Sequence, residues 1–335
     1  MSTRRWLSLE STVLLYFLSY VPNVVVLKLV TSRPHPQLGR ALTGLETLPA
    51  TLILNMLMTY AFIWVSGWHR DAHGISVGGL RVPVPTRYTC LSALGTALVL
   101  FTVPLSFTFT DVSIPFMQLL MRGDILLIAP IVDLLFGRRV RWWSWVALGM
   151  VAAAILMVVR QRGGFALPPL ALLTVALYVV GYFTRLAVMT HVAKSGDPAS
   201  VRRYFVEEKI VALPLAVVAL ALLASSGIGV QAGELEWGFV RVWSDPVMGW
   251  IIFLGASLTV IGVFAAMILL DARENSYCVP LERSSSLLAG LVGAYLLYWG
   301  WDLPAPSASE MAGAIVLVAA IALLWIAPRR AAAAR

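Results

Sequence analysis

The chain is 335 residues long, 59% of its residues are hydrophobic, and only 13% are charged. A soluble domain carries about twice that share of charged residues, so soluble, disordered, fibrous and disulfide-scaffold classes are excluded. The net charge of +8 resides in no basic stretch interleaved with aromatic residues, so no nucleic acid is expected as a partner.

Apolar segments follow one another along the chain, each of about the 20 residues that cross a hydrocarbon core. We expect spans at 9–31, 42–66, 88–109, 112–136, 140–159, 166–190, 204–227, 247–270, 275–299 and 308–327. The first follows a basic start but is too long for a signal peptide, so we expect it to remain uncleaved. The expected fold class is therefore an all-α polytopic membrane protein with ten transmembrane helices.

Basic residues are unevenly distributed among the connections. Most lie in the N-terminal tail, in 67–87, 137–139, 191–203 and 271–274, and in the C-terminal tail, which all fall on one side of a ten-span chain. Since such residues mark the inner side, we expect both termini in the cytoplasm. Arginine greatly outnumbers lysine and alanine is abundant, which suggests a GC-rich bacterial genome and hence a bacterial inner membrane. A eukaryotic source would instead indicate a Golgi or plastid membrane.

The chain repeats itself weakly at one offset. Residues of the first half recur in order in the second half, as in the pairs Tyr16 and Tyr178, Tyr20 and Tyr182, Glu46 and Glu208, Arg122 and Arg283, and Gly149 and Gly313. Each repeat has five spans, an odd number, so the second would enter the membrane from the opposite side. We therefore predict two inverted-topology five-helix repeats, 1–162 and 163–335, which together form one membrane transport domain. A structural duplication without transport is the alternative.

Three stretches carry a family resemblance. They are YFLSYVPNVVVLK at 16–28, FMQLLMRGD at 116–124 and VPLERSSS at 279–286. With the five-plus-five layout, they resemble the drug/metabolite transporter superfamily, and most closely its nucleotide-sugar and triose-phosphate translocator branch. The resemblance implies a transporter that works by alternating access. Phosphate-specific members carry a Lys-Arg pair in the ninth span, where this chain has Glu282 and Arg283, and this departure argues against a dianionic phosphate.

Charged residues inside the predicted spans indicate where a substrate would bind, because each costs about 2.5–3.5 kcal/mol on insertion scales. Arg122 and Arg283 occupy equivalent places in the two repeats, so we predict that they approach each other and clamp a carboxylate or phosphate of the substrate. Gln118 belongs to the same stretch as Arg122. The alternative is that each arginine is held in a structural ion pair. Arg122 would pair with Asp124 or an acid of a neighbouring helix, and Arg283 with Glu282 or Glu46.

Two stripes of aromatic and polar residues have helical spacing and are predicted to line the same site. The stripe of the first span is Tyr16, Tyr20 and Asn23, and that of the sixth span is Tyr178, Tyr182 and Arg185. Their rings and polar tips suit a base, a sugar or an organic cation. Ordinary aromatic packing is the alternative for the tyrosines.

Acidic residues near the starts of spans are candidates for proton coupling. Glu46 and Glu208 would carry a proton if burial raised the pKa of either, and the alternative is that they complement the helix dipole. We expect Glu207 to play only that dipole role, Lys209 to extend to the membrane surface, and Asp133 to form a surface pair with the arginines that follow it.

The histidine pair at 69 and 73 is expected to lie in a solvated loop rather than to bind a metal. No nucleophile elbow, P-loop or Cys/His metal set is present, so no enzyme, cofactor or metal is expected. The predicted function is a secondary-active transporter of a small polar metabolite with an anionic group: a nucleotide sugar, an organic phosphate or a carboxylate.

Several alternatives to this function stay open. They are a proton-coupled exporter of amphipathic or cationic compounds, a flippase of lipid-linked sugars or phospholipids, and a membrane scaffold that transports nothing. The expected partners are the small-molecule substrate, the lipid bilayer, and a proton or counter-substrate. The chain would act as a monomer or a homodimer.

Overall fold

The computed structural model describes residues 8–78, 80–105, 121, 125–160, 169–227, 229–303 and 308–333, and most of them are helical. The helices are α1 (Leu9–Ser32), α2 (Gly44–Val65), α3 (Arg87–Leu105), α5 (Ile125–Leu135), α6 (Trp142–Arg160), α7 (Pro169–Val192), α8 (Pro198–Ser225), α9 (Gly229–Val240), α10 (Met248–Leu269), α11 (Asn275–Trp301) and α12 (Ala308–Ala333). Two short 3-10 helices, η1 (Trp68–Arg70) and η2 (Val242–Ser244), lie in connections. Each segment predicted as a span overlaps one α-helix of the described residues, and in 112–136 that helix is α5, of only 11 residues.

Five of the described helices, α1, α2, α7, α8 and α10, are long and apolar enough to cross a membrane. At 1.5 Å per residue, a helix of 22 residues such as α10 spans about 33 Å, slightly more than a hydrocarbon core. Large apolar side chains on these helices stay exposed, among them Leu14, Leu57 and Leu222. Lipid is the solvent that such a surface suits, so the chain has the features of an integral membrane protein.

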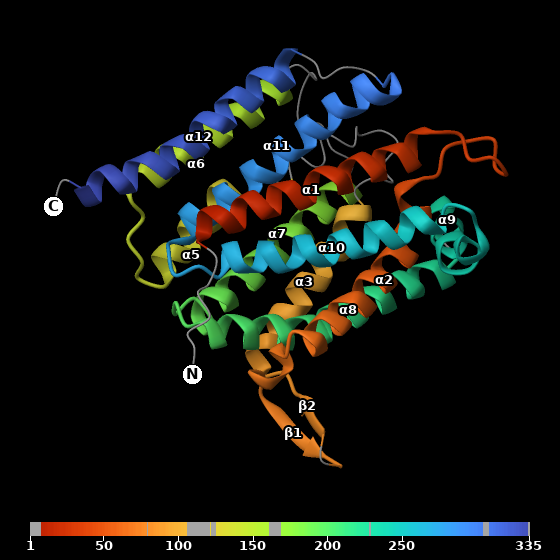
Figure 1. Ribbon diagram of the computed structural model, residues 1–335, viewed down its shortest axis with the longest axis horizontal. Helices are drawn as coiled ribbons and strands as arrows, with labels where there is room; N and C mark the ends of the chain where they lie inside the picture. Colours follow the sequence, from red (N-terminus) through yellow and green to blue (C-terminus); the bar gives the residue numbers. More distant parts are fainter. Residues whose placement is uncertain are drawn as a thin grey trace.

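The helices form one elongated bundle whose long members run in roughly the same direction (Figure 1). Helix α1 packs against α10 and α11, α3 packs against α7 and α8, and α2 packs against α9 and α10. Helices α6 and α12 lie side by side along one edge (Figure 1). Helix α1 begins and α12 ends at the same end of the bundle, at the left in Figure 1, which we call the termini end.

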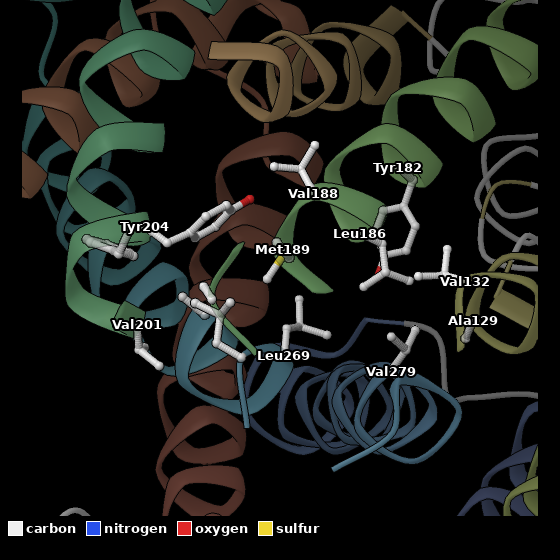
Figure 2. Close-up of a cluster of buried hydrophobic side chains, with 14 of the residues drawn as sticks. Ala129, Val132, Tyr182, Leu186, Val188, Met189, Val201, Tyr204, Leu269 and Val279 are labelled. Atoms are coloured by element: carbon white, nitrogen blue, oxygen red, sulfur yellow. The ribbon is translucent and has the colours of Figure 1, made fainter. Parts of the chain in front are cut away.

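A cluster of buried apolar side chains fills the space between α5, α7, α8, α10 and α11 (Figure 2). Its labelled members are Ala129, Val132, Tyr182, Leu186, Val188, Met189, Val201, Tyr204, Leu269 and Val279. The cluster contains Tyr182, which is one of the residues predicted to line the site. Of the helices that carry candidate residues, α7, α8 and α11 are thus held by this core.

Glycines allow two helices to approach closely. A Cβ atom added to Gly95 of α3 would lie 2.5 Å from the backbone oxygen of Gly181 in α7, and one added to Gly181 would lie 2.8 Å from that of Gly95. Small residues at such crossings let helix backbones come into direct contact in membrane proteins. The position of α7, which carries three candidate site residues, therefore depends on this pair.

Two elements are absent from the sequence prediction. The connection 67–87, expected to be a loop, contains an antiparallel hairpin of β1 (Gly74–Val77) and β2 (Leu80–Pro83). The connection after α8 contains α9, which packs against α2 and α8. A Cβ atom added to Gly238 of α9 would lie 2.5 Å from the backbone oxygen of Glu46, so α9 fits tightly over the start of α2.

Candidate functional site

A buried carboxylate joins helices α1 and α11. The Tyr16 hydroxyl of α1 donates a hydrogen bond of 2.5 Å to Oε1 of Glu282 in α11. Both residues are buried, with 2% of Tyr16 and 6% of Glu282 exposed. A hydrogen bond to a charged acceptor is stronger than one between neutral groups, so this contact fixes the orientation of the carboxylate.

Arg283 sits between Glu282 and the tyrosines of α7. Its Nε lies 3.4 Å from Oε2 of Glu282, and its Nη2 donates a hydrogen bond of 3.0 Å to the Tyr178 hydroxyl. Its guanidinium carbon lies 4.9 Å from the ring centroid of Tyr182. The rings of Tyr178 and Tyr182 stack with an interplanar angle of 17°. A guanidinium held over a ring face and beside a hydroxyl combines a cation–π contact with a directional hydrogen bond.

A second buried group surrounds Glu208 of α8. Its Oε1 lies 3.3 Å from Nε of Arg185, its Oε2 lies 2.9 Å from Nζ of Lys209, and the Thr96 hydroxyl of α3 donates to it. Lys209 does not extend to the surface as expected, because only 12% of its side chain is exposed and its ammonium pairs with Glu208. Its charge also faces the ring of Phe205 at 5.8 Å.

Helix α7 connects the two groups. Tyr178, Tyr182 and Arg185 lie on one face of this helix, so Arg283 contacts the tyrosines while Arg185, one turn further on, contacts Glu208. Glu282 also acts electrostatically on Arg185. The candidate site therefore combines side chains from α1, α3, α7, α8 and α11.

The candidate site carries a charge imbalance. Its cations are Arg185, Lys209 and Arg283, and its carboxylates are Glu208 and Glu282. Within the described residues this group has one positive charge in excess. In a medium of low dielectric constant such an excess attracts an anion strongly.

The remaining residues of the first stripe lie beside this group. The ring of Tyr20 lies 5.5 Å from that of Tyr16. Asn23, on the next turn, donates a hydrogen bond of 2.6 Å from Nδ2 to the Ser257 hydroxyl of α10. Asn23 is buried, so its amide links α1 to α10.

Some predicted residues fall elsewhere. Arg122, Gln118 and Asp124 lie outside the described residues. The described contacts of Glu46 are those of a helix start: Thr43 and Glu46 form a capping box, and Nη2 of Arg40 lies 2.5 Å from Oε1 of Glu46. This arrangement agrees with the dipole role that was the alternative for Glu46, and it adds a capping box that was not predicted.

Asp133 differs most from its expected role. It is fully buried rather than a surface partner of the arginines that follow it. It accepts hydrogen bonds of 2.7 to 2.9 Å from the backbone and side chains of Asn275 and Ser276, at the start of α11. A carboxylate at a helix N-terminus satisfies free N–H groups and complements the dipole.

Further polar contacts close the termini end around Asp133. Lys194, in the connection after α7, donates a hydrogen bond of 2.8 Å to the Leu269 carbonyl, and burial lowers the pKa of its ammonium. Arg138 donates to the carbonyls of Lys194, Ala272 and Arg273. We call Asp133, Arg138 and Lys194 the termini latch. Sequence reasoning missed this role because the partners lie more than 50 residues away along the chain.

The histidines of the hairpin connection do not form a metal site in the described part of the chain, where no group of three or more ligating residues occurs. Nδ1 of His73 lies 2.7 Å from Oε1 of Glu207. Glu207 also accepts a hydrogen bond of 3.0 Å from the Thr89 hydroxyl. It therefore binds the connection before α3 and does more than complement the dipole of α8.

Comparisons with known proteins bear on the fold alone. No protein-family model and no curated protein matches the chain. A solved structure described only as "Crystal structure of protein" is similar over 96% of this chain and 98% of its own, with a TM-score of 0.55 and 17% sequence identity. At that identity the similarity shows a shared fold that extends over nearly the whole of both chains.

Proposed function

We propose that this chain is a secondary-active transporter that moves a small polar organic metabolite with an anionic group across the membrane by alternating access. In this proposal ten helices span the bilayer, both termini are cytoplasmic, and residues 1–162 and 163–335 are inverted five-helix repeats. A bacterial inner membrane is the proposed location. The substrate binds between α1, α7, α8 and α11.

The pattern of helix packing supports the two repeats. If α1, α2, α3, α5 and α6 correspond in order to α7, α8, α10, α11 and α12, each pair should have an exchanged counterpart. The pair of α3 and α7 corresponds to that of α10 and α1, and the pair of α3 and α8 to that of α10 and α2. The pair of α1 and α11 corresponds to that of α7 and α5, which also pack together. Such exchange symmetry is what a twofold relation between inverted repeats produces.

The excess positive charge of the candidate site is the observation that supports an anionic substrate. Arg283 and Arg185 approach their carboxylates at 3.4 Å and 3.3 Å, longer than the 2.7–2.9 Å of a well-formed charge-assisted hydrogen bond. A carboxylate or phosphate of a substrate would bind these guanidiniums in competition with Glu282 and Glu208. The carboxylates hold the cations in place while the site is empty.

The paired tyrosines support an organic substrate rather than a bare ion. The stacked rings of Tyr178 and Tyr182 lie beside Arg283, and the tilted rings of Tyr16 and Tyr20 lie beside Glu282. Ring faces add apolar contact area, and hydroxyls add directional hydrogen bonds. A planar or ring-shaped metabolite with one acidic group would use both features.

A proton-coupled exporter is the second candidate function, and the surroundings of Glu208 favour it. The carboxylate is 1% exposed and lies between two cations. Protonation of Glu208 would release Arg185 and Lys209 together, which would couple a proton to a change in the site. Glu46 is less suited to this role because a capping box holds its carboxylate.

A ligand screen followed by an exchange assay tests the proposal. Purified protein should be stabilised against heat by its substrate in a panel of nucleotide sugars, phosphorylated metabolites, carboxylates and quaternary amines. Liposomes that contain the protein and are loaded with the same compound should then take up its labelled form. Stabilisation by quaternary amines alone would contradict an anionic substrate and favour the exporter.

The Glu282→Gln variant separates the two candidates. If an anion competes with Glu282 for Arg283, the variant should bind the anion more tightly than the wild type. If Glu282 or Glu208 carries a coupling proton, the Gln variants should instead lose the dependence of transport on a pH gradient. The matched control is Glu236→Gln, which removes an exposed carboxylate from α9.

A further inference from the structure

The hairpin of β1 and β2 projects sideways from the bundle, at the end of α2 and the start of α3 (Figure 1). Ile75 and Val82 are cross-strand partners in its register, so their side chains share one face. They are 57% and 42% exposed. A two-stranded hairpin with an apolar pair left open is marginal in water and requires a surface to cover that face.

The base of the hairpin is fixed to the bundle. Glu207 of α8 is only 1% exposed and accepts a hydrogen bond of 3.0 Å from the backbone N–H of His73, immediately before β1. Arg202 forms an ion pair with Asp71, and Arg203 donates a hydrogen bond of 3.0 Å to the backbone oxygen of Asp71. These contacts set the direction in which the hairpin projects, so its exposed face has a defined position relative to the spanning helices.

Basic and amphipathic residues surround the base of the hairpin. Arg70 and Arg87 are exposed beside it. The neighbouring acids are already engaged, because Asp71 pairs with Arg202 and Glu207 is buried. Trp64, at the end of α2, is 48% exposed, and such tryptophans mark the level at which lipid tails give way to headgroups.

We propose that the hairpin is a membrane-surface anchor, with Ile75 and Val82 inserted at the headgroup level and with Arg70 and Arg87 bound to anionic lipid headgroups. An apolar face flanked by arginines is what binds an element to the surface of an anionic leaflet. With cytoplasmic termini, this is the inner leaflet. The inference requires the bundle to sit in a bilayer, and it does not depend on which solute, if any, the chain transports.

The lipid anchor would have a consequence for α8. Glu207, which holds the hairpin base, is the neighbour of Glu208 in the candidate site. A hairpin bound to the leaflet would hold the first turns of α8 at a fixed position relative to the membrane. The other helices would then move relative to α8 and the anchored hairpin.

Nitroxide labels on the full-length protein test the anchor. In a Cys90→Ser background, which leaves only the buried Cys278, labels are placed at Ile75→Cys, at Val82→Cys and at Ser76→Cys on the other face of the hairpin. The vesicles are phosphatidylcholine alone or mixed with an equal amount of phosphatidylglycerol. In the mixed vesicles, labels at 75 and 82 should favour collision with oxygen, and the label at 76 should favour collision with a water-soluble nickel complex.

The arginines are tested in the same vesicles. Arg70→Gln and Arg87→Gln combined should make the label at 75 as accessible to nickel in mixed vesicles as in phosphatidylcholine alone. Arg241→Gln, which removes an exposed arginine before η2, should leave accessibility unchanged. Equal nickel access at 75, 76 and 82 in mixed vesicles would overturn the anchor and leave the hairpin open to a soluble protein. Protection at 75 that persists in the double variant would overturn the role of the headgroups.

Discussion

The Tyr16 hydroxyl donates a hydrogen bond of 2.5 Å to Glu282, a residue 266 positions further along the chain. The contact joins the first helix of the chain to the helix that carries Arg283, so it links the two proposed repeats at the candidate site. Because Glu282 also lies beside Arg283, the tyrosine controls where the carboxylate stands when a substrate anion competes for the guanidinium.

Tyr16→Phe should destabilise the protein. The change removes one donor to a buried carboxylate, and hydrogen bonds to charged groups contribute about 1.5–3 kcal/mol. Thermal unfolding in detergent should therefore begin at a lower temperature than in the wild type. Tyr298→Phe, which removes a hydroxyl from the exposed outer part of α11, is the control and should unfold as the wild type does. Identical unfolding of the two variants would contradict the role of Tyr16.

Glu208→Gln should be more damaging, because it leaves Arg185 and Lys209 buried without their common counterion. Removing one partner of a buried ion pair costs about 3–5 kcal/mol. Combining the change with Lys209→Met should restore part of the lost stability, since one uncompensated cation then disappears. A double-mutant cycle of thermal stability measures the coupling. Additive effects of the two substitutions would show that Glu208 and Lys209 do not interact.

Gly95→Ala should disturb the crossing of α3 and α7. The added Cβ atom would lie 2.5 Å from a backbone oxygen, and backbone has no rotamer by which to move away. We expect lower thermal stability and, because α7 carries Arg185, weaker substrate binding. Gly149→Ala in α6 is the matched control, since nothing lies within 4 Å of its added Cβ atom. Equal stability of the two variants would show that the crossing is not tightly packed.

Asp133→Ala should open the termini latch. The carboxylate binds four donors at the start of α11, and losing about 3 kcal/mol of these interactions favours the open form roughly a hundredfold. Cys278, on the first turn of α11, is fully buried. In a Cys90→Ser background its labelling by a maleimide should become faster. Arg139→Ala in the neighbouring connection is the control, and a labelling rate equal to that control would contradict the latch.

The five helices that are long and apolar enough to cross a membrane were predictable, because length and apolarity are visible in the sequence itself. The two missed elements follow other rules. Helix α9 has 12 residues and contains Glu234 and Glu236, so it has no apolar run to detect. The hairpin did leave a signal, because two short runs that include Ile75 and Val82 flank Gly78 and Gly79, a pair typical of two-residue turns. In a chain dominated by long apolar runs, that short pattern was assigned to a loop.

The candidate site was predictable in its residue types but only in part in its partners. Helical spacing alone places Tyr178 and Tyr182 on one face of α7 with Arg185, and the structure joins this face to Arg283. The pairing of Arg185 with Glu208 was not predictable, since it depends on how α7 and α8 pack. The same holds for Asp133, whose hydrogen-bond donors lie at the start of a distant helix.

Transport by Arg283 variants tests the central claim most directly. In liposomes that exchange a labelled anionic metabolite, Arg283→Ala should lose nearly all transport, whereas Arg283→Lys, which keeps the charge but not the planar fork, should retain part of it. Arg241→Ala, which removes an exposed arginine, should transport as the wild type does. Wild-type exchange by a folded Arg283→Ala protein would contradict the proposed anion site.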